Sequence, residues 1–510
     1  MAAVGSDASL VRVSSGLLHG IVEPDLRFFG GVPYAAPPVG PLRLRSPQPP
    51  AVWSGVRDAT KTGLRCIQDD GGDLLRGRGT SEDCLSLNVW TPSAGSGSDP
   101  SPVLVWFHGG AFVNGSGGIY NARRLATRGH LVVVTLNYRL GALGFLAHPV
   151  LGSDPAVGNF GMADQQAALR WVRDNIAAFG GDPAQVTIAG ESAGAMAVCD
   201  HLVAPGSAGL FRSAIIVSGP CQAQGNLARA RQASLDYARW VGCGDPATAA
   251  TCLRALPMRR FQRPLFYYNI GDDPLGGPVV GTALLPHGPM NLIGAGRAAA
   301  VPVLIGSNRD EFTLFVALEY LRKGRRYYRS DYPNLLAKTF GPNAAAVARR
   351  YPLSDFKGSV PLAYSAAVTD GYFSCVGDWI GDALAGAAPV YAYEFNDRKA
   401  PAPPPLRRLP FDVGASHSLD LRYIFDMGGA TPMTQAQRVL SDHMIDYWSS
   451  FVAGGRPRVP GLPSWPRMVA GQHSDRMSLQ PGGLTIDQSF RRVHQCAFWA
   501  GVPSWPGLPG

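Results

Sequence analysis

The sequence QVTIAGESAGAMA, at residues 185–197, is the stretch that best predicts both the fold and the chemistry. Its β-branched run at 186–188 is typical of a buried strand, and the small residues after it suit a helix packed close to that strand. Between them, residues 190–194 (GESAG) match the G-x-S-x-G pattern of a nucleophile elbow. Ser192 would lie on a sharp turn, where glycine on either side avoids a steric clash. The N–H groups that begin the following helix would face the place where an oxyanion forms.

The composition favours a large folded chain without a membrane span or a nucleic-acid partner. Of 510 residues, 46% are hydrophobic and only 16% are charged, which is typical of a chain with a sizeable core. The net charge is +9, but the basic residues are scattered rather than gathered in the stripe that nucleic-acid binding needs. No apolar run reaches the roughly twenty residues of a transmembrane helix. No spacing of cysteine and histidine suggests zinc, so we expect no metal site.

Apolar runs alternate with helical patterns along the chain. Runs typical of strands occur at residues 10–13, 17–22, 26–29, 85–90, 103–107, 131–136, 185–189, 214–218, 301–305, 390–395 and 482–486. Residues 161–178 have the apolar spacing of a helix, and Thr434–Gln437 matches a capping box that opens another helix. This alternation predicts an α/β fold with a large, mostly parallel central sheet flanked by helices.

A serine nucleophile needs a histidine base and an acid, and the order along an α/β-hydrolase chain is serine, acid, histidine. That order excludes the histidines before Ser192. Of the later ones, His417 lies in the small-residue loop GASHS, where a positioned but adjustable base is expected. Glu311 follows the apolar run 301–305 on the turn NRDE, and Asp310 beside it is the competing acid. The remaining histidines lie in helical, proline-flanked or polar stretches that suit a base less well: His201, His287, His443, His473 and His494.

A second glycine-rich turn supplies candidate donors for an oxyanion. Residues 106–112 (WFHGGAF) follow an apolar run, and their HGG pattern is one whose backbone N–H groups face an oxyanion. We expect Gly109 and Gly110 to donate from this turn, and Ala193, directly after the serine, to be the third donor. An HGG turn roughly eighty residues before a G-x-S-x-G pattern is more specific than either pattern alone.

Together these motifs resemble the type-B carboxylesterases, the family that includes the cholinesterases, over nearly the whole chain. The matching stretches are GVPYA (31–35), PPVG (37–40), SEDCL (81–85), LNV (87–89), NYRLG (137–141), GNFG (158–161), DQQAAL (164–169), FGGDP (179–183), GESAG (190–194), NRDE (308–311), His417 with Asp420, and residues 448–455 with Trp465-Pro466. The resemblance points to a microbial carboxylesterase with an α/β-hydrolase fold. It implies a single domain over residues 1–510, with helical insertions at about 226–300 and 312–387 around an active-site gorge.

The resemblance also implies roles for individual residues. The implied sets are the catalytic triad Ser192, Glu311 and His417, and a buried group behind it, in which Glu191 and Asp420 are the acids and Ser218 joins them by hydrogen bonding. Without the resemblance, the two carboxylates of that group would be ordinary helix-start and loop residues.

The eight cysteines gain partners from the resemblance as well. The implied disulfides are Cys66–Cys84, Cys243–Cys252 and Cys375–Cys496. Cys199 and Cys221 have no implied partner, and they would be buried free thiols or a fourth bridge. Three bridges favour an oxidising compartment, so we expect a secreted or periplasmic protein rather than a cytoplasmic one. Because residues 1–10 lack the pattern of a signal peptide, that signal would already be absent from this chain.

We therefore predict a serine carboxylesterase that hydrolyses small-molecule esters through an acyl-enzyme, with no cofactor, as a monomer or weak homodimer. The loop from Cys66 to Cys84 lacks the aromatic residue with which cholinesterases bind choline, which argues against choline esters. The alternatives are a cholinesterase-like adhesion or binding protein without hydrolysis, an amidase or carbamate hydrolase, and a lipase. The scattered arginines leave an anionic ester open as the substrate.

Overall fold

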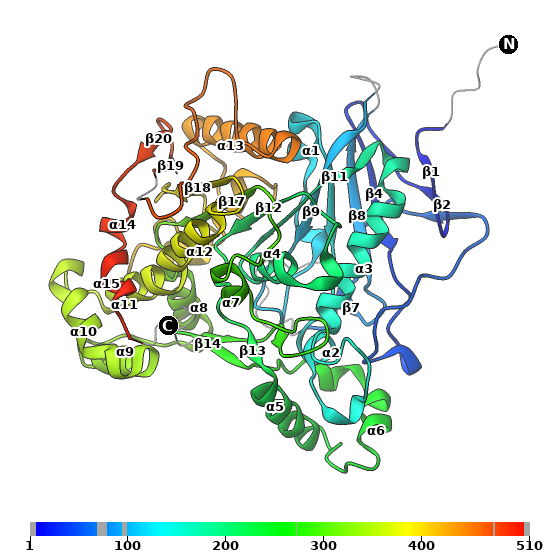
Figure 1. Cartoon of the computed structure of the whole chain (residues 1–510), viewed down its shortest axis with the longest axis horizontal. Coiled ribbons are helices and arrows are strands. Elements are labelled where there is room, and N and C mark those ends of the chain that lie inside the picture. The colour runs from blue at the N-terminus through cyan, green and yellow to red at the C-terminus, as the bar shows by residue number, and fades with distance from the viewer. Residues whose placement is uncertain (1–6, 69–78, 94–98, 272, 473–474, 504–510) are drawn as a thin grey trace. The chain divides into compact units, whose positions relative to one another are not determined.

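The computed structural model describes residues 7–68, 79–93, 99–271, 273–472 and 475–503 (Figure 1). The chain divides into two compact units. Unit 1 comprises residues 1–214, 224–267 and 276–287, and unit 2 comprises residues 215–223, 268–275 and 288–510. Each unit contains strands accompanied by helices, as the predicted α/β class requires.

The main sheet strands of unit 1 include the parallel strands that lead into the predicted motifs. Their order is β11 (Gly181–Glu191), β9 (Ser101–Phe107), β10 (Val132–Leu136), β8 (Ser86–Pro92), β4 (Leu26–Pro33) and β3 (Ile21–Val22). Strand β9 pairs in parallel with both β10 and β11, whereas β8 pairs antiparallel with β10 and β4. Every residue of β10 is buried, which explains why this strand is a continuous apolar run in the sequence.

Helices follow the parallel strands of unit 1, because a parallel pair needs a long crossover connection. The helices are α1 (Arg123–Gly129), α2 (Gly141–Phe145), α3 (Phe160–Asn175), α4 (Ala193–Val203), α5 (Leu227–Trp240) and α6 (Ala249–Ala255). A separate three-stranded sheet contains β1 (Leu10–Val13), β2 (Gly16–His19) and β5 (Val56–Asp58). The strand predicted over residues 17–22 is therefore wrong in extent, since it is interrupted at Gly20. A Cβ at Gly20 would come within 2.4 Å of the Phe29 ring.

Unit 2 has its own set of mostly parallel strands. Their order is β20 (Thr485–Asp487), β19 (Arg476–Leu479), β18 (Val390–Phe395) and β17 (Val303–Asn308), and β12 (Ser213–Val217) lies where the two units divide. Strands β17, β18 and β19 pair in parallel, and β20 pairs antiparallel with β19. The sequence analysis missed β19. Its Arg476 is buried against the Asp378 carboxylate, a partner almost a hundred positions earlier that no local pattern reveals.

Helices make up most of the remainder of unit 2. They are α7 (Pro289–Gly294), α8 (Thr313–Lys323), α9 (Tyr332–Phe340), α10 (Ala344–Arg350), α11 (Val360–Thr369), α12 (Cys375–Ala385), α13 (Gln435–Gly454), α14 (Phe490–Val493) and α15 (Cys496–Ala500). The predicted capping box opens α13, with the Thr434 and Gln437 side chains each bonded to the other's backbone N–H. In the described part of the chain, no helix combines the length and hydrophobicity needed to cross a bilayer.

The three implied disulfides are confirmed. Cys66–Cys84 and Cys243–Cys252 lie in unit 1, and Cys375–Cys496 lies in unit 2. Cys199 and Cys221 are disulfide-bonded as well, so the alternative of free thiols is wrong.

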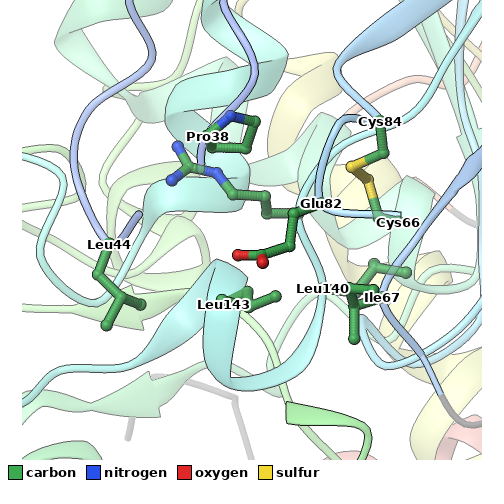
Figure 2. A pocket seen from close by; sticks show the side chains of 9 residues that line it. Pro38, Leu44, Cys66, Ile67, Glu82, Cys84, Leu140 and Leu143 are labelled. Atoms are coloured by element: carbon green, nitrogen blue, oxygen red, sulfur yellow. A yellow bond between two sulfur atoms is a disulfide. The ribbon is translucent and has the colours of Figure 1, made fainter. Parts of the chain in front are cut away.

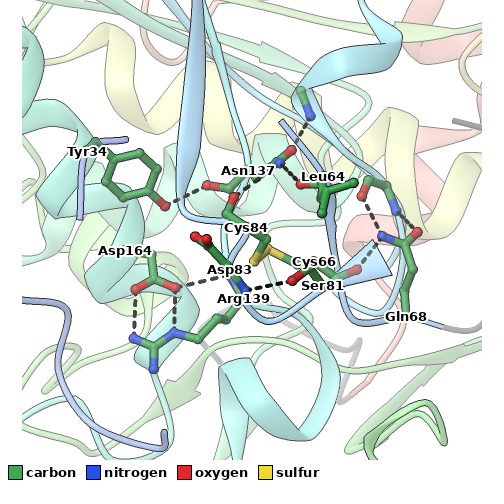
Figure 3. Close-up of a disulfide and its surroundings, with 12 residues drawn as sticks. Tyr34, Leu64, Cys66, Gln68, Ser81, Asp83, Cys84, Asn137, Arg139 and Asp164 are labelled. Carbon is green, nitrogen blue, oxygen red and sulfur yellow. Dashed lines mark hydrogen bonds and ion pairs between the residues drawn. A yellow bond between two sulfur atoms is a disulfide. The ribbon is translucent and has the colours of Figure 1, made fainter. Parts of the chain in front are cut away.

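Amide side chains bind the described residues at the two ends of the loop closed by Cys66 and Cys84 (Figure 3). The Asn137 amide donates to the Leu64 and Cys84 carbonyls at 2.8 and 3.2 Å, and the Gln68 amide donates to the Cys66 carbonyl at 2.9 Å. The cavity beside this disulfide has a volume of only about 10 Å³, which leaves room for no more than one water molecule (Figure 2). It is therefore too small to be a substrate pocket.

Candidate active site

The predicted turn at Ser192 has the geometry of a nucleophile elbow. Strand β11 ends at Glu191, helix α4 begins at Ala193, and Ser192 between them has φ 58° and ψ −122°. A positive φ is strained for a residue with a Cβ, and such strain is typical of functional turns. The flanking glycines are required, because a Cβ at Gly190 would come within 2.4 Å of the Gly194 carbonyl, and a Cβ at Gly194 within 2.0 Å of the Phe107 oxygen.

The HGG turn lies against this elbow within unit 1. A Cβ at Gly109 would come within 2.7 Å of a Glu191 carboxylate oxygen and 3.2 Å of the Ser192 Cβ. Before it, His108 stacks on the Tyr138 ring with 4.3 Å between the ring centroids. Burial lowers the pKa of His108 to about 4, so its imidazole is neutral. The structure therefore places Gly109 and Glu191 beside Ser192.

The Tyr120 hydroxyl lies in the same buried environment as Gly109 and Glu191. Burial raises the pKa of the Tyr120 hydroxyl and Glu191 adds to the rise, whereas a backbone hydrogen bond with Gly109 opposes it. The next residue, Gly110, accepts hydrogen bonds from the N–H groups of Val113 and Asn114, both at 3.0 Å.

In unit 2, the predicted base and acid are in direct contact. The His417 Nδ1 lies 2.6 Å from Glu311 Oε2, and both side chains are buried. The other Glu311 oxygen accepts a hydrogen bond from the Asn308 N–H at 2.7 Å. The His417 ring packs against Phe315 and Phe373, with centroid distances of 5.0 and 5.5 Å. A neutral imidazole that donates from Nδ1 to Glu311 has the lone pair of its Nε2 on the side of the ring that faces away from Glu311.

The structure also shows which of the two neighbouring carboxylates contacts His417. The Asp310 carboxylate accepts hydrogen bonds from the Arg398 guanidinium at 2.6 Å and from the Ala415 N–H at 3.0 Å. Glu311, and not Asp310, contacts the His417 ring.

Asp420 and Ser218 lie near the same loops of unit 2. The Asn308 amide donates to Asp420 Oδ1 at 3.0 Å, and Asn308 is the residue whose N–H binds Glu311. Ser218 has φ 53° and donates its N–H to the Gly306 carbonyl at 2.8 Å, at the end of β17. Asp420 is thus linked to the acid through Asn308, whereas the hydrogen bond of Ser218 is to the strand that precedes the acid.

Comparison with known proteins identifies the family to which this arrangement belongs. Residues 7–499 match the family model described as Carboxylesterase family. The chain belongs to the carboxylesterase family. This membership confirms the resemblance found in the motifs and, with it, the α/β-hydrolase fold.

Relatives from bacteria and mammals agree with this assignment. The para-nitrobenzyl esterase of Bacillus subtilis (strain 168) is 34% identical over 477 residues, which cover 90% of this chain and 92% of the relative. The cocaine esterase of Homo sapiens is 33% identical over 498 residues, covering 92% and 86%, respectively. The pyrethroid hydrolase Ces2e of Rattus norvegicus is 32% identical over 480 residues, covering 89% and 82%. This carboxylesterase is accordingly a carboxylic-ester hydrolase.

One of the histidines that the sequence analysis disfavoured, His201, has other partners in the carboxylesterase. His201 is buried between Ser207 Oγ and Gln165 Oε1 at 2.7 and 3.1 Å, and burial lowers the pKa of its imidazole to about 3. His443 lies on helix α13 as expected, and His473 lies outside the described residues.

Sequence analysis missed a buried ionic cluster around His494. The His494 Nδ1 donates to Asp370 Oδ1 at 2.5 Å, and its Nε2 donates to Glu394 Oε1. The two carboxylates outweigh the effect of burial and raise the pKa of His494 to about 9. His494 is therefore protonated at neutral pH and cannot be a general base. No local signal could reveal it, because its partners lie 124 and 100 positions away in the chain.

Proposed function

We propose that this carboxylesterase hydrolyses esters through an acyl-enzyme formed on Ser192, with His417 as the general base and Glu311 as the acid. The observation that carries the proposal is the buried 2.6 Å contact between His417 Nδ1 and Glu311 Oε2. The strained turn at Ser192, between strand β11 and helix α4, supports the assignment of the nucleophile.

In the acylation step, His417 Nε2 takes the proton of the Ser192 hydroxyl while its oxygen attacks the ester carbonyl. Glu311 accepts the hydrogen bond from Nδ1–H, sets the tautomer and stabilises the imidazolium. The tetrahedral intermediate then expels the alcohol, which leaves with the proton from His417. Water repeats the same sequence on the acyl-enzyme and releases the carboxylic acid, so the reaction needs no electron transfer and no co-reactant besides water.

The negative oxygen of the intermediate needs backbone donors near Ser192. From the sequence we expected Gly109, Gly110 and Ala193. Gly109 lies against Glu191 and Ser192, which supports this assignment of the donors. Each well-aimed donor contributes about 3 kcal/mol to the stability of the transition state.

Asp420 and Glu191 would act behind the reacting groups. Asp420 accepts from the Asn308 amide, and the Asn308 backbone N–H donates to Glu311, so Asp420 helps to hold the acid at its present angle. Glu191 lies beside Gly109. Ser218 donates its backbone N–H to the Gly306 carbonyl of strand β17. These contacts support the positioning role that the resemblance implies.

Small-molecule esters are the proposed substrate class, in keeping with relatives named as a para-nitrobenzyl esterase and a cocaine esterase. The disulfides favour an oxidising compartment, so we propose a secreted or periplasmic protein. We propose a monomer or weak homodimer without a nucleic-acid partner, which size-exclusion chromatography with light scattering can test.

Labelling with a fluorophosphonate probe tests the nucleophile. The wild type should lose all turnover of a short-chain nitrophenyl ester at one label per chain, and peptide mapping should find the label on Ser192. Ser192→Ala should neither react nor turn over, with an unchanged melting temperature. Turnover by Ser192→Ala at the wild-type rate would refute the proposal. A parallel series of amides and carbamates separates an esterase from an amidase or carbamate hydrolase.

A further inference from the structure

Two loops of unit 2 carry the proposed acid and base, and their backbones are bonded to each other. The Asp310 N–H donates to the Ala415 carbonyl at 3.0 Å, and the His417 N–H donates to the Glu311 carbonyl at 3.3 Å. The Thr313 hydroxyl adds a bond of 2.6 Å to the Val413 carbonyl. The position of the His417 ring relative to Glu311 therefore depends on how these two loops are joined.

Asp310 joins the loops twice. Besides its backbone N–H, its Oδ2 accepts the N–H of Ala415 at 3.0 Å, so Asp310 and Ala415 form a reciprocal pair. Gly414, with φ +60°, makes room for this carboxylate, because a Cβ there would come within 2.2 Å of Asp310 Oδ2. Ala415 lies two positions before His417. A shift of the Asp310 carboxylate would consequently move the backbone that carries the base.

The ion pair between Asp310 and Arg398 contributes less to joining the two loops than the bond between Asp310 and the Ala415 N–H. Arg398 donates to Asp310 Oδ1 at 2.6 Å, but 62% of the Arg398 side chain is exposed, compared with 17% of the Asp310 side chain. Exposed ion pairs contribute little because water and salt screen them. The bond between Asp310 and the Ala415 N–H is therefore the one that joins the loops.

We propose that Asp310 is a positioning residue for ester hydrolysis, which holds His417 at the distance from Glu311 that proton transfer needs. This inference rests on the proposed function, since it assigns a task to the neighbour of the acid. Misplacing a catalytic group by about 1 Å can cost a hundredfold in rate, so a loop bond near the base affects kcat strongly. Substrate binding is not involved, so KM stays the same.

Two substitutions separate the shape of the Asp310 side chain from its charge. Asp310→Asn keeps an oxygen acceptor of the same length for the Ala415 N–H and removes the charge. Asp310→Glu keeps the charge, but its carboxylate is one methylene too long for the space beside Gly414. Asp310 lines a cavity of about 490 Å³ that water can enter, so Asp310→Ala leaves no sealed void and should fold.

The experiment measures kcat, KM and melting temperature for these three variants on one nitrophenyl ester. Asp310→Asn should keep kcat within about threefold, whereas Asp310→Glu and Asp310→Ala should lose about ten- to a hundredfold, with KM within twofold. Asp355→Ala, an exposed carboxylate lining the same cavity, should match the wild type. Arg398→Ala should lose less than threefold.

The inference is overturned if Asp310→Glu keeps the wild-type kcat, if Asp310→Asn falls as far as Asp310→Ala, or if the loss appears in KM. The Ser192→Ala variant distinguishes a failure of the positioning role of Asp310 from a failure of the proposed function. If Ser192→Ala is inactive and Asp310→Glu is fully active, only the positioning role fails. If Ser192→Ala stays active, the proposed function fails whatever the Asp310 variants do.

Discussion

Loss of the His494 proton at alkaline pH should destabilise the carboxylesterase by about 2 to 3 kcal/mol between pH 7 and pH 10. His494 is buried and donates to Asp370 and Glu394, and these carboxylates raise its pKa from 6.5 to about 9. Glu394 also binds Arg309 at 3.1 Å, and Asp370 also accepts from the Tyr351 hydroxyl at 2.7 Å. The cluster therefore connects the C-terminal segment with strand β18 and with the turn after helix α11.

The sign and size of this change in stability follow from the linkage between protonation of His494 and folding. Because the folded pKa lies above the unfolded one, the stabilisation is complete below pH 6.5 and disappears as the pH rises through about 9. The full difference corresponds to about 3 kcal/mol, most of which remains at pH 7. For a chain of 510 residues, this equals a shift in melting temperature of about 2 °C.

The assay compares melting temperatures of the wild type and His494→Gln from pH 6.5 to pH 10 at constant ionic strength. Glutamine cannot carry the charge, so the variant should melt lower at pH 7, and the difference from the wild type should shrink by about 2 °C by pH 10. His443→Gln, on helix α13 of the same unit, is the matched control and should follow the wild-type curve. Parallel curves for the wild type and His494→Gln would refute the reasoning.

Three further predictions concern the proposed acid, the elbow and the longest disulfide loop. Glu311→Gln should lower kcat by roughly 10³- to 10⁴-fold with an unchanged fold, because an amide no longer holds the imidazole in the working tautomer; a loss of less than tenfold in steady-state kinetics contradicts this. Gly194→Ala should destabilise the protein by about 1–3 kcal/mol or more, because its Cβ would lie 2.0 Å from the Phe107 oxygen, and a wild-type melting temperature would disprove the clash. Replacing Cys375 and Cys496 together by serine should lower the free energy of unfolding by about 5 kcal/mol, since their disulfide closes a loop of 121 residues, and an unchanged denaturation midpoint would contradict that figure.

Local patterns were sufficient for much of the fold. The strands before the two glycine-rich turns were predicted because their burial on both faces makes them continuously apolar, as in β10. The start of helix α13 was predicted because the Thr434–Gln437 capping box involves residues only three positions apart. Strand β19 was missed because Arg476 is polar in the sequence and becomes buried only through Asp378.

The candidate site likewise has one part that local sequence predicts and another part that depends on the tertiary structure. The elbow at Ser192 could be predicted from five residues, because the strain of the turn and the lack of room on either side are local properties of the backbone. Only the tertiary structure decided that Glu311 rather than Asp310 meets His417, since both carboxylates lie on one turn and the partner loop arrives from more than a hundred positions away. A sequence motif indicates which backbone conformations its own segment can adopt. Hydrogen bonds and ion pairs between distant segments depend on where the completed fold brings their side chains.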